Sequence, residues 1–313
     1  MEKFQVTVLG CGSALPTLRH KASAQVVNIR DKYFLLDCAE GTQLELRRNH
    51  IHLNRINTIF ITHLHGDHCF GLVGMLSTLS LLGRTADMHI YGPIGIEQTF
   101  RPQLDFFCEG IAYRIHFHEI NTKEFSEVFE DRSLSVFSIP LKHRVPCCGY
   151  LFKEKPLRPH IRPEAIKKYE IPVWQINNIK AGCDFQLPDG TIICNEQLTT
   201  PADPPRSFAY CTDTMYSPRI ADLIADADLL YHEATFAESE LALCTKVFHS
   251  TARQAAQIAE KAHAQQLLIG HFSSRYEDEN LLLNEAKAVF PNTVLANEGL
   301  TINIMPHNRI AQK

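Results

Sequence analysis

The stretch Ile59–His68, IFITHLHGDH, constrains this chain more than any other. Its first three residues are apolar, which is typical of a short buried strand. Four side chains of the types that bind metal ions follow within six positions, at His63, His65, Asp67 and His68. Because His63 and His65 are two residues apart, an extended backbone places both imidazoles on the same side. The segment therefore predicts a metal site at the end of a core strand.

The second part of this stretch changes direction. Gly66 permits a sharp turn, and we expect Asp67 and His68 to begin the apolar helix GLVGMLSTLSLLG. Two imidazoles are then available to one ion, and a carboxylate with an imidazole to a second ion. These ligands suit zinc, with manganese and iron as alternatives. Polar groups gathered in this way are costly to bury without a cation.

Two further H-x-H pairs provide a comparison, at His50–His52 and His116–His118. Neither is followed by an Asp-His pair, and neither stands at the end of a core strand. We predict that both occupy alternating strand positions or the surface.

Three more candidate ligands also come after apolar runs. His143 follows LSVFSIPL, Asp213 follows SFAYCT, and His271 follows QLLIG. Strand ends along one edge of stacked sheets lie close together, so residues distant in sequence can meet there. Seven ligands suit two metal ions. We predict His63, His65 and His143 on the first ion, Asp67, His68 and His271 on the second, and Asp213 bridging both.

The chain as a whole predicts one large domain of the α+β class, covering residues 1–313. With 313 residues, of which 45% are hydrophobic, it can bury a large core. Strand and helix patterns alternate up to about residue 140, and the second half also delivers ligands from strand ends. This pattern favours a sheet-on-sheet core covered by outer helices.

The segment from about 150 to 190 interrupts this pattern. It is rich in proline, and residues 150–180 carry seven Lys and Arg against three Glu, in a chain whose net charge is −4. Such a shift in composition indicates an inserted basic arm. The alternative is a solvated surface loop.

Other features bound the cellular setting. The N-terminus shows no signal peptide, and the apolar run near residues 72–82 is too short to cross a membrane. Ten cysteines are scattered without a C-x-x-C pair, which favours a reducing cytoplasm. The glycine-rich GCGSALPT lacks the G-K-[ST] of a nucleotide-binding loop. The net charge does not itself indicate a nucleic-acid binder, although it can hide a local basic patch.

Several motifs together resemble a known family. THLHGDH with the later His, Asp and His resembles the metallo-β-lactamase superfamily. Within it, the chain is similar to ribonuclease Z, the transfer-RNA 3′-processing endonucleases, over nearly its whole length apart from the arm. The motifs that carry this resemblance are GCGSALPT, DCAEGTQ, CTDT, YHEATF, HST and HFSSRY. The resemblance implies a four-layered αββα sandwich, two Zn2+ ions per chain (or Mn2+ or another divalent metal) and a homodimer.

The resemblance also implies roles for individual residues. Asp67 would bind metal and accept a proton from the attacking water. His249 and Glu233 would lie near the leaving 3′ oxygen, where an imidazole oriented by a carboxylate can donate a proton. The alternatives are a helix-terminal histidine without chemistry and a buried salt-bridge partner. Arg275 would face substrate phosphates.

Two departures from the family pattern concern substrate binding. The stretch IPVWQINNIKAGCDF lacks the glycine-proline-rich hairpin expected at the arm, although Lys167 and Lys168 keep it basic and Trp174 could stack or pack. The loop PTLRHKASA keeps Arg19 as a substrate-binding candidate and a shifted Lys21, which bears on discrimination against substrates that end in CCA.

Three functions compete at this stage. The first is a zinc-dependent endoribonuclease that removes the 3′ trailer from precursor transfer RNA and leaves a 3′-hydroxyl. The second is another hydrolase of the superfamily that acts on a small phosphodiester or another ester. The third is an RNA-binding protein with a vestigial site, which is disfavoured because every ligand position is filled.

Overall fold

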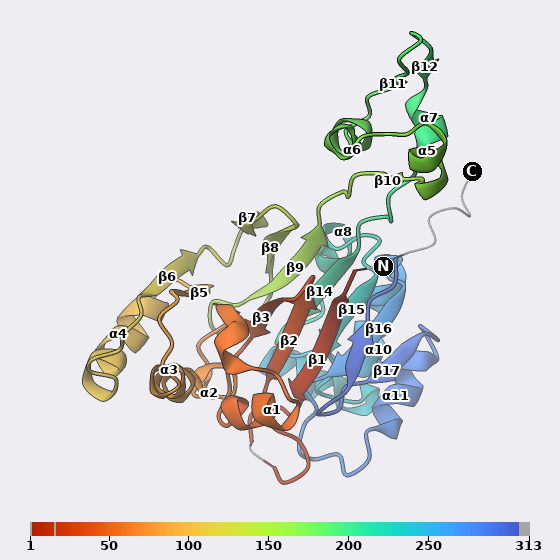
Figure 1. Cartoon of the computed structure of the whole chain (residues 1–313). Helices are drawn as coiled ribbons and strands as arrows, with labels where there is room; N and C mark the ends of the chain where they lie inside the picture. Colours follow the sequence, from red (N-terminus) through yellow and green to blue (C-terminus); the bar gives the residue numbers. More distant parts are fainter. Residues whose placement is uncertain (1, 16, 307–313) are drawn as a thin grey trace. The chain divides into compact units, whose positions relative to one another are not determined.

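The computed structural model describes residues 2–15 and 17–306, which form two compact units (Figure 1). The larger unit contains Glu2–Lys153 and the described residues from Arg206 onward. The smaller unit is Glu154–Pro205. Each unit has its own hydrophobic core.

The first sheet of the larger unit has seven strands. Their order is β18 (Thr301–Asn303), β1 (Phe4–Gly10), β2 (Ala24–Ile29), β3 (Lys32–Leu36), β4 (Ile56–Phe60), β5 (Met88–Pro93) and β6 (Ile115–Ile120). Strands β2 and β3 pair antiparallel across a tight turn. Arg30 and Asp31 form that turn with φ of 51° and 64°, which matches the right-handed twist of the strands. From β3 to β6 the strands are parallel.

The second sheet also has seven strands. Their order is β17 (Thr293–Leu295), β16 (Gln266–Gly270), β15 (Leu229–Glu233), β14 (Ser207–Cys211), β9 (Cys148–Glu154), β8 (Leu134–Pro140) and β7 (Ser126–Glu130). Strands β14 to β17 are parallel and mostly buried, as is usual for parallel strands covered on both faces. Their carboxyl ends therefore lie at one edge of the sheet.

The two sheets pack face to face through aromatic side chains. The ring of Phe60 on β4 lies 4.9 Å from that of Tyr150 and 5.5 Å from that of Phe152, both on β9. The outer face of the first sheet is covered by α1 (Thr42–Arg48), α3 (Leu72–Leu81) and α4 (Ile96–Phe107). On the second sheet lie α8 (Arg219–Leu223), α10 (Ala252–Lys261) and α11 (Asn280–Lys287). This αββα arrangement confirms the predicted fold (Figure 1).

The remaining helical segments of this unit are short. They are η1 (Leu53–Arg55), α2 (Gly66–Cys69), η2 (Glu238–Glu240) and α9 (Leu241–Val247). Asp67 and His68 belong to α2. The prediction that they begin the longer apolar helix was therefore wrong, because that helix is α3. Gly71 lies between α2 and α3, where the packing requires glycine, because a Cβ atom there would lie 1.9 Å from the carbonyl oxygen of Ala39. A capping box formed by Thr251 and Gln254 begins α10.

The smaller unit is more ordered than a solvated loop. It contains α5 (Pro163–Lys168), α6 (Val173–Lys180), α7 (Asn195–Leu198) and two short strand pairs, β10 (His160–Ile161) with β13 (Thr199–Thr200) and β11 (Phe185–Gln186) with β12 (Ile192–Ile193). Its core is formed by Ala165, Ile171, Ile179, Phe185, Ile193 and Leu198. The unit extends to residue 205, beyond the expected end near residue 190.

Two further observations concern membrane-spanning helices and cysteines. Within residues 2–15 and 17–306, no helix combines the length and apolar character needed to span a bilayer. All ten cysteines are free thiols.

Candidate metal centre

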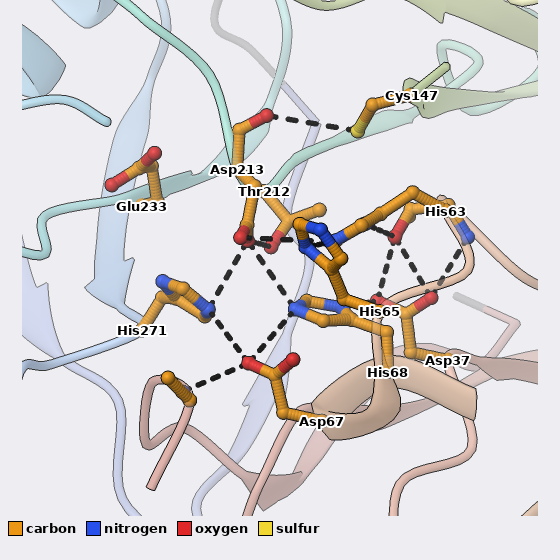
Figure 2. A network of polar contacts seen from close by, with 12 residues as sticks. Asp37, His63, His65, Asp67, His68, Cys147, Thr212, Asp213, Glu233 and His271 are labelled. Atoms are coloured by element: carbon orange, nitrogen blue, oxygen red, sulfur yellow. Dashed lines mark hydrogen bonds and ion pairs between the residues drawn. The ribbon is translucent and has the colours of Figure 1, made fainter. Parts of the chain in front are cut away.

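The ends of several strands place the seven predicted ligands at one edge of the two sheets. His63 follows β4, and His65, Asp67 and His68 lie in or next to α2. His143 follows β8, Asp213 follows β14, and His271 follows β16. The structure brings all seven side chains together in two groups that share Asp213. Figure 2 shows these ligands except His143.

The first group consists of three imidazoles. Nε2 of His63 lies 3.0 Å from Nδ1 of His65, and Nε2 of His143 lies 3.2 Å from that same atom. The Oδ2 atom of Asp213 lies 3.7 Å from His63 Nε2 and 3.8 Å from His143 Nε2. In a tetrahedral site with bonds of about 2.0–2.1 Å, ligand atoms lie about 3.3 Å apart. The four side chains therefore fit one zinc ion.

The second group faces the other oxygen of Asp213. Its Oδ1 atom lies 3.3 Å from Nε2 of His68 and 3.1 Å from Nε2 of His271. The Oδ2 atom of Asp67 lies 3.6 Å and 3.7 Å from the same two nitrogens. Both nitrogens are buried and have no hydrogen-bond partner within the described chain. Buried polar atoms of this kind are normally paired, so the group fits a second cation.

The other ring nitrogens of these histidines are held in place. Nδ1 of His63 lies 3.1 Å from Thr62 Oγ1, and Nδ1 of His143 lies 3.1 Å from the carbonyl oxygen of Phe248. Nδ1 of His271 lies 2.9 Å from Thr235 Oγ1. Contacts of this type fix the tautomer and the orientation of a metal-binding imidazole.

Asp37 is an important residue that sequence reasoning did not assign to the site. Its Oδ2 atom lies 2.8 Å from Nδ1 of His68 and accepts a hydrogen bond of 3.0 Å from the hydroxyl of Tyr210. Its Oδ1 atom accepts from the backbone N–H of Thr62 at 2.8 Å. Asp37 has a φ of 55°, which turns the chain immediately after β3. Two signals were available: this aspartate directly follows an apolar strand, and it begins the DCAEGTQ motif.

The pKa of His68 is shifted in the opposite direction from the pKa values of the three histidines of the first group. Burial lowers the pKa of His63, His65 and His143, which favours the neutral imidazole that binds metal. Burial also opposes charge on His68, but Asp213 and Asp37 outweigh it and raise its pKa. A proton and a cation therefore compete for Nε2 of His68.

His249 lies beside this edge, in contact with Glu233. Nδ1 of His249 is 2.9 Å from Oε1 of Glu233, which also accepts the backbone N–H of Thr214 at 2.7 Å. Burial lowers the pKa of His249, but the charge of Glu233 and its hydrogen bond outweigh burial and raise the pKa to about 9. The ring of His249 lies 5.4 Å from that of His271. An imidazolium is thus held next to the ligand cluster.

A pocket of about 440 Å³ opens onto this centre. Two ligands, His65 and Asp67, contribute to its lining together with Phe70 and Arg144. Phe70 is 73% exposed. Neither Phe70 nor Arg144 was singled out from the sequence.

The residues expected to bind substrate lie in different places. The guanidinium of Arg275 lies 3.0 Å from Glu240 and 4.8 Å from the ring of Phe236, which in turn lies 6.1 Å from His249. Arg19 forms an ion pair with Glu279 at 2.8 Å, so its guanidinium is partly engaged within the chain. Lys167 and Lys168 are exposed on α5 of the smaller unit. Substrate contact by these residues stays a prediction.

Comparison with known proteins identifies the family. Residues 199–272 match the beta-lactamase superfamily domain, and residues 4–130 match the family described as anti-Pycsar protein Apyc1. A ribonuclease Z from Bacteroides fragilis strain YCH46 is 56% identical over 304 residues, which cover 97% of this chain and 100% of that protein. The chain belongs to the ribonuclease Z family. Family membership makes it a hydrolytic endoribonuclease.

Two other similarities agree with this assignment. A ribonuclease Z from Porphyromonas gingivalis strain ATCC 33277 is 50% identical over 304 residues, covering 97% of this chain and all of that protein. The crystal structure of the short form of human tRNase Z has a TM-score of 0.71 and 27% identity, covering 96% of this chain and 99% of that chain. These findings confirm the resemblance read from the sequence motifs.

Proposed function

We propose that this ribonuclease Z family member cuts precursor transfer RNA on the 3′ side of the acceptor stem, removes the 3′ trailer and leaves a 3′-hydroxyl. Transfer-RNA 3′ processing by an endoribonuclease of the metallo-β-lactamase superfamily is the activity that family membership assigns to this chain. The observation that carries the proposal is the pair of ligand groups that share Asp213, with His249 beside them.

The ligand groups support two divalent cations per chain, with zinc favoured by the imidazole-rich first group. His63, His65 and His143 would hold the first ion, Asp67, His68 and His271 the second, and Asp213 both. Two cations held close together make water a stronger nucleophile and stabilise negative charge on phosphoryl oxygens. Manganese would suit the second group better than the first, because it prefers oxygen ligands.

Two residues of the chain would move protons in this reaction. Burial raises the pKa of Asp67, but the imidazoles of His271 and His68 outweigh burial and hold the pKa well below its usual value. Asp67 is therefore ionised and able to accept a proton from the attacking water. His249 carries a proton at neutral pH and donates it to the departing 3′ oxygen, while Glu233 holds the ring in position.

Substrate binding draws on basic side chains around the centre and in the smaller unit. Arg275 presents a forked guanidinium suited to phosphate, and Arg19 lies on the loop that follows β1. In the smaller unit, Lys167 and Lys168 supply positive charge, and the ring of Trp174 is 71% exposed. Contacts of this kind give salt-dependent affinity for the phosphate backbone of RNA and recognise RNA by its shape.

The family resemblance also supports a homodimer in a reducing cytoplasm. The ten free thiols are compatible with a reducing compartment. Light scattering coupled to size-exclusion chromatography tests the oligomeric state. A mass close to 35.5 kDa, that of one chain, would contradict the dimer.

The decisive experiment incubates the metal-loaded protein with end-labelled precursor transfer RNA, with and without an encoded CCA, and maps both product ends. The proposal expects a single cut near the acceptor stem and a 3′-hydroxyl on the transfer-RNA product. Chelation or His65→Ala should abolish it. Hydrolysis of small phosphodiesters without any cut in the precursor would favour the alternative, a hydrolase of small esters.

A further inference from the structure

A second cluster of metal-binding side chains lies outside the catalytic centre, at Cys11, His20 and Glu298. Cys11 follows β1, His20 lies at the far end of the loop that begins there, and Glu298 lies between β17 and β18. Cys11 and His20 are buried, with exposures of 0% and 7%. The cluster therefore joins three segments in the interior of the larger unit.

The distances within this cluster match those between the ligands of one small cation. Sγ of Cys11 lies 3.3 Å from Nδ1 of His20 and 3.7 Å from Oε1 of Glu298. Nδ1 of His20 lies 3.1 Å from Oε2 of Glu298. Tetrahedral zinc, with bonds of about 2.3 Å to sulfur and about 2.0–2.2 Å to nitrogen and oxygen, separates its ligands by about 3.3–3.6 Å. The carbonyl oxygen of Ala296, 3.5 Å from the same sulfur, would be a further ligand atom for the cation.

The surroundings of His20 also resemble those of a metal ligand. Its Nε2 atom, which points away from Cys11 and Glu298, lies 3.2 Å from Oε1 of Glu279. A carboxylate on the second nitrogen is the usual partner of a metal-binding histidine. Glu279 is in turn paired with Arg19 at 2.8 Å. The carboxylate is thus held in place by a second contact.

We propose that Cys11, His20 and Glu298 form a third metal site, which binds one zinc-like divalent cation and is distinct from the catalytic pair. A thiolate, an imidazole and a carboxylate together favour zinc among the common cellular metals. Glu279 orients His20 from behind the site.

The net charge of the cluster stays the same when the ion enters. In the metal-free cluster, the hydrogen bond with Glu298 raises the pKa of His20, so an imidazolium and Arg19 balance Glu279 and Glu298. Burial and Glu298 raise the pKa of Cys11, which keeps the thiol protonated. A divalent cation replaces two protons, one from the thiol and one from Nδ1 of His20, and both leave to solvent. The cluster is neutral before and after this exchange.

The site would fix a loop that reaches the catalytic centre. The backbone N–H of Ala14, on the loop between Cys11 and His20, donates a hydrogen bond of 2.8 Å to Oδ2 of Asp67. An ion that holds both ends of this loop would therefore also hold in place the N–H of Ala14, which donates to Asp67. This connects the third site to the geometry of the second catalytic cation.

Cobalt substitution tests the site, because cobalt bound to a thiolate gives a charge-transfer absorption in the near ultraviolet. The catalytic ligand groups contain no cysteine, so this absorption reports the third site. The starting protein carries Cys183→Ser and Cys194→Ser, which removes the two exposed thiols. We expect thiolate absorption that saturates at one cobalt per chain, and three bound ions in total.

Variants assign the absorption to its ligand. Cys11→Ala should abolish it and lower the metal content by one ion. Cys69→Ala, at a buried thiol near the catalytic centre, should keep both the absorption and the metal content.

Glu279→Gln should weaken metal binding at the third site about 10–100-fold. Calorimetry in two buffers should show release of about two protons per ion, with affinity that rises with pH. Absence of thiolate absorption in the starting protein at saturating cobalt, or its survival in Cys11→Ala, would overturn the proposal.

Discussion

Nδ1 of His249 lies 2.9 Å from Oε1 of Glu233, and His249 lies at the edge of the ligand cluster, beside Asp213 and His271. The carboxylate is fully buried and is further held by the backbone N–H of Thr214 and the hydroxyl of Thr235. This pair connects two of the sequence motifs. YHEATF supplies the carboxylate of Glu233, and HST supplies the imidazole of His249 that this carboxylate orients.

The first prediction concerns the acid. His249→Ala should lower kcat on precursor transfer RNA about 10²–10⁴-fold, because the leaving alkoxide loses its proton donor. Hydrolysis of bis-p-nitrophenyl phosphate should fall much less, because p-nitrophenolate leaves without a proton. Zinc content should equal that of the wild type. Loss of an ion, or equal losses on both substrates, would refute the role given to His249.

The second prediction is a change in pH dependence. The pKa of His249 is raised to about 9, so the imidazolium is present below that pH and is lost as the pH rises through it. Glu233→Gln removes the charge that raises this pKa, so the alkaline limb of kcat/KM should move to lower pH. A pH–rate profile of both proteins checks this. Glu240→Gln, at a more exposed carboxylate, should leave the limb unchanged.

The third prediction concerns Asp37. Asp37→Asn should weaken binding at the second catalytic cation about 10–100-fold, because the acceptor that orients His68 loses its charge. Dialysis against graded chelator followed by elemental analysis measures this loss. Asp31→Asn, at the exposed turn between β2 and β3, is the control. Equal metal retention in the two variants would show that Asp37 does not act through His68.

The fourth prediction concerns the smaller unit. Lys153 on β9 pairs with Ser207 on β14, so a short turn can replace Glu154–Pro205 without breaking the sheet. This deletion should abolish cleavage of folded precursor transfer RNA and spare hydrolysis of a small phosphodiester. Equal loss of both activities would contradict a role in RNA binding.

A milder variant tests the same role without deleting structure. Lys167→Glu combined with Lys168→Glu should weaken RNA binding and reduce its salt dependence, because fewer phosphates are neutralised. Lys287→Glu, at an exposed position of α11, is the matched control. An unchanged salt dependence in the double variant would exclude these lysines from the RNA interface.

The sequence predicted those parts of the site that local patterns encode. His63, His65, Asp67 and His68 follow one core strand, and His143, Asp213 and His271 each follow another. Strand ends are visible in sequence because apolar runs stop abruptly there. Their convergence followed from the expectation that such ends share one edge of the sheets.

Other features could not be read in this way. Asp37 orients His68 across 31 residues, and Cys11 meets Glu298 across 287, so only the pairing of strands brings them together. The smaller unit was underestimated because core residues such as Ile171 and Phe185 follow neither a helical nor a strand period. Its core depends on contacts between short elements, which periodicity does not reveal.

The central claim is that seven side chains hold two cations around Asp213. The most direct test is anomalous diffraction at the zinc absorption edge from crystals of the zinc-replete protein. At this centre the account predicts two peaks about 3.5–4 Å apart, one among His63, His65 and His143 and the other among Asp67, His68 and His271. They would be separate from the peak expected at Cys11, His20 and Glu298. Absence of anomalous density between these residues would contradict it.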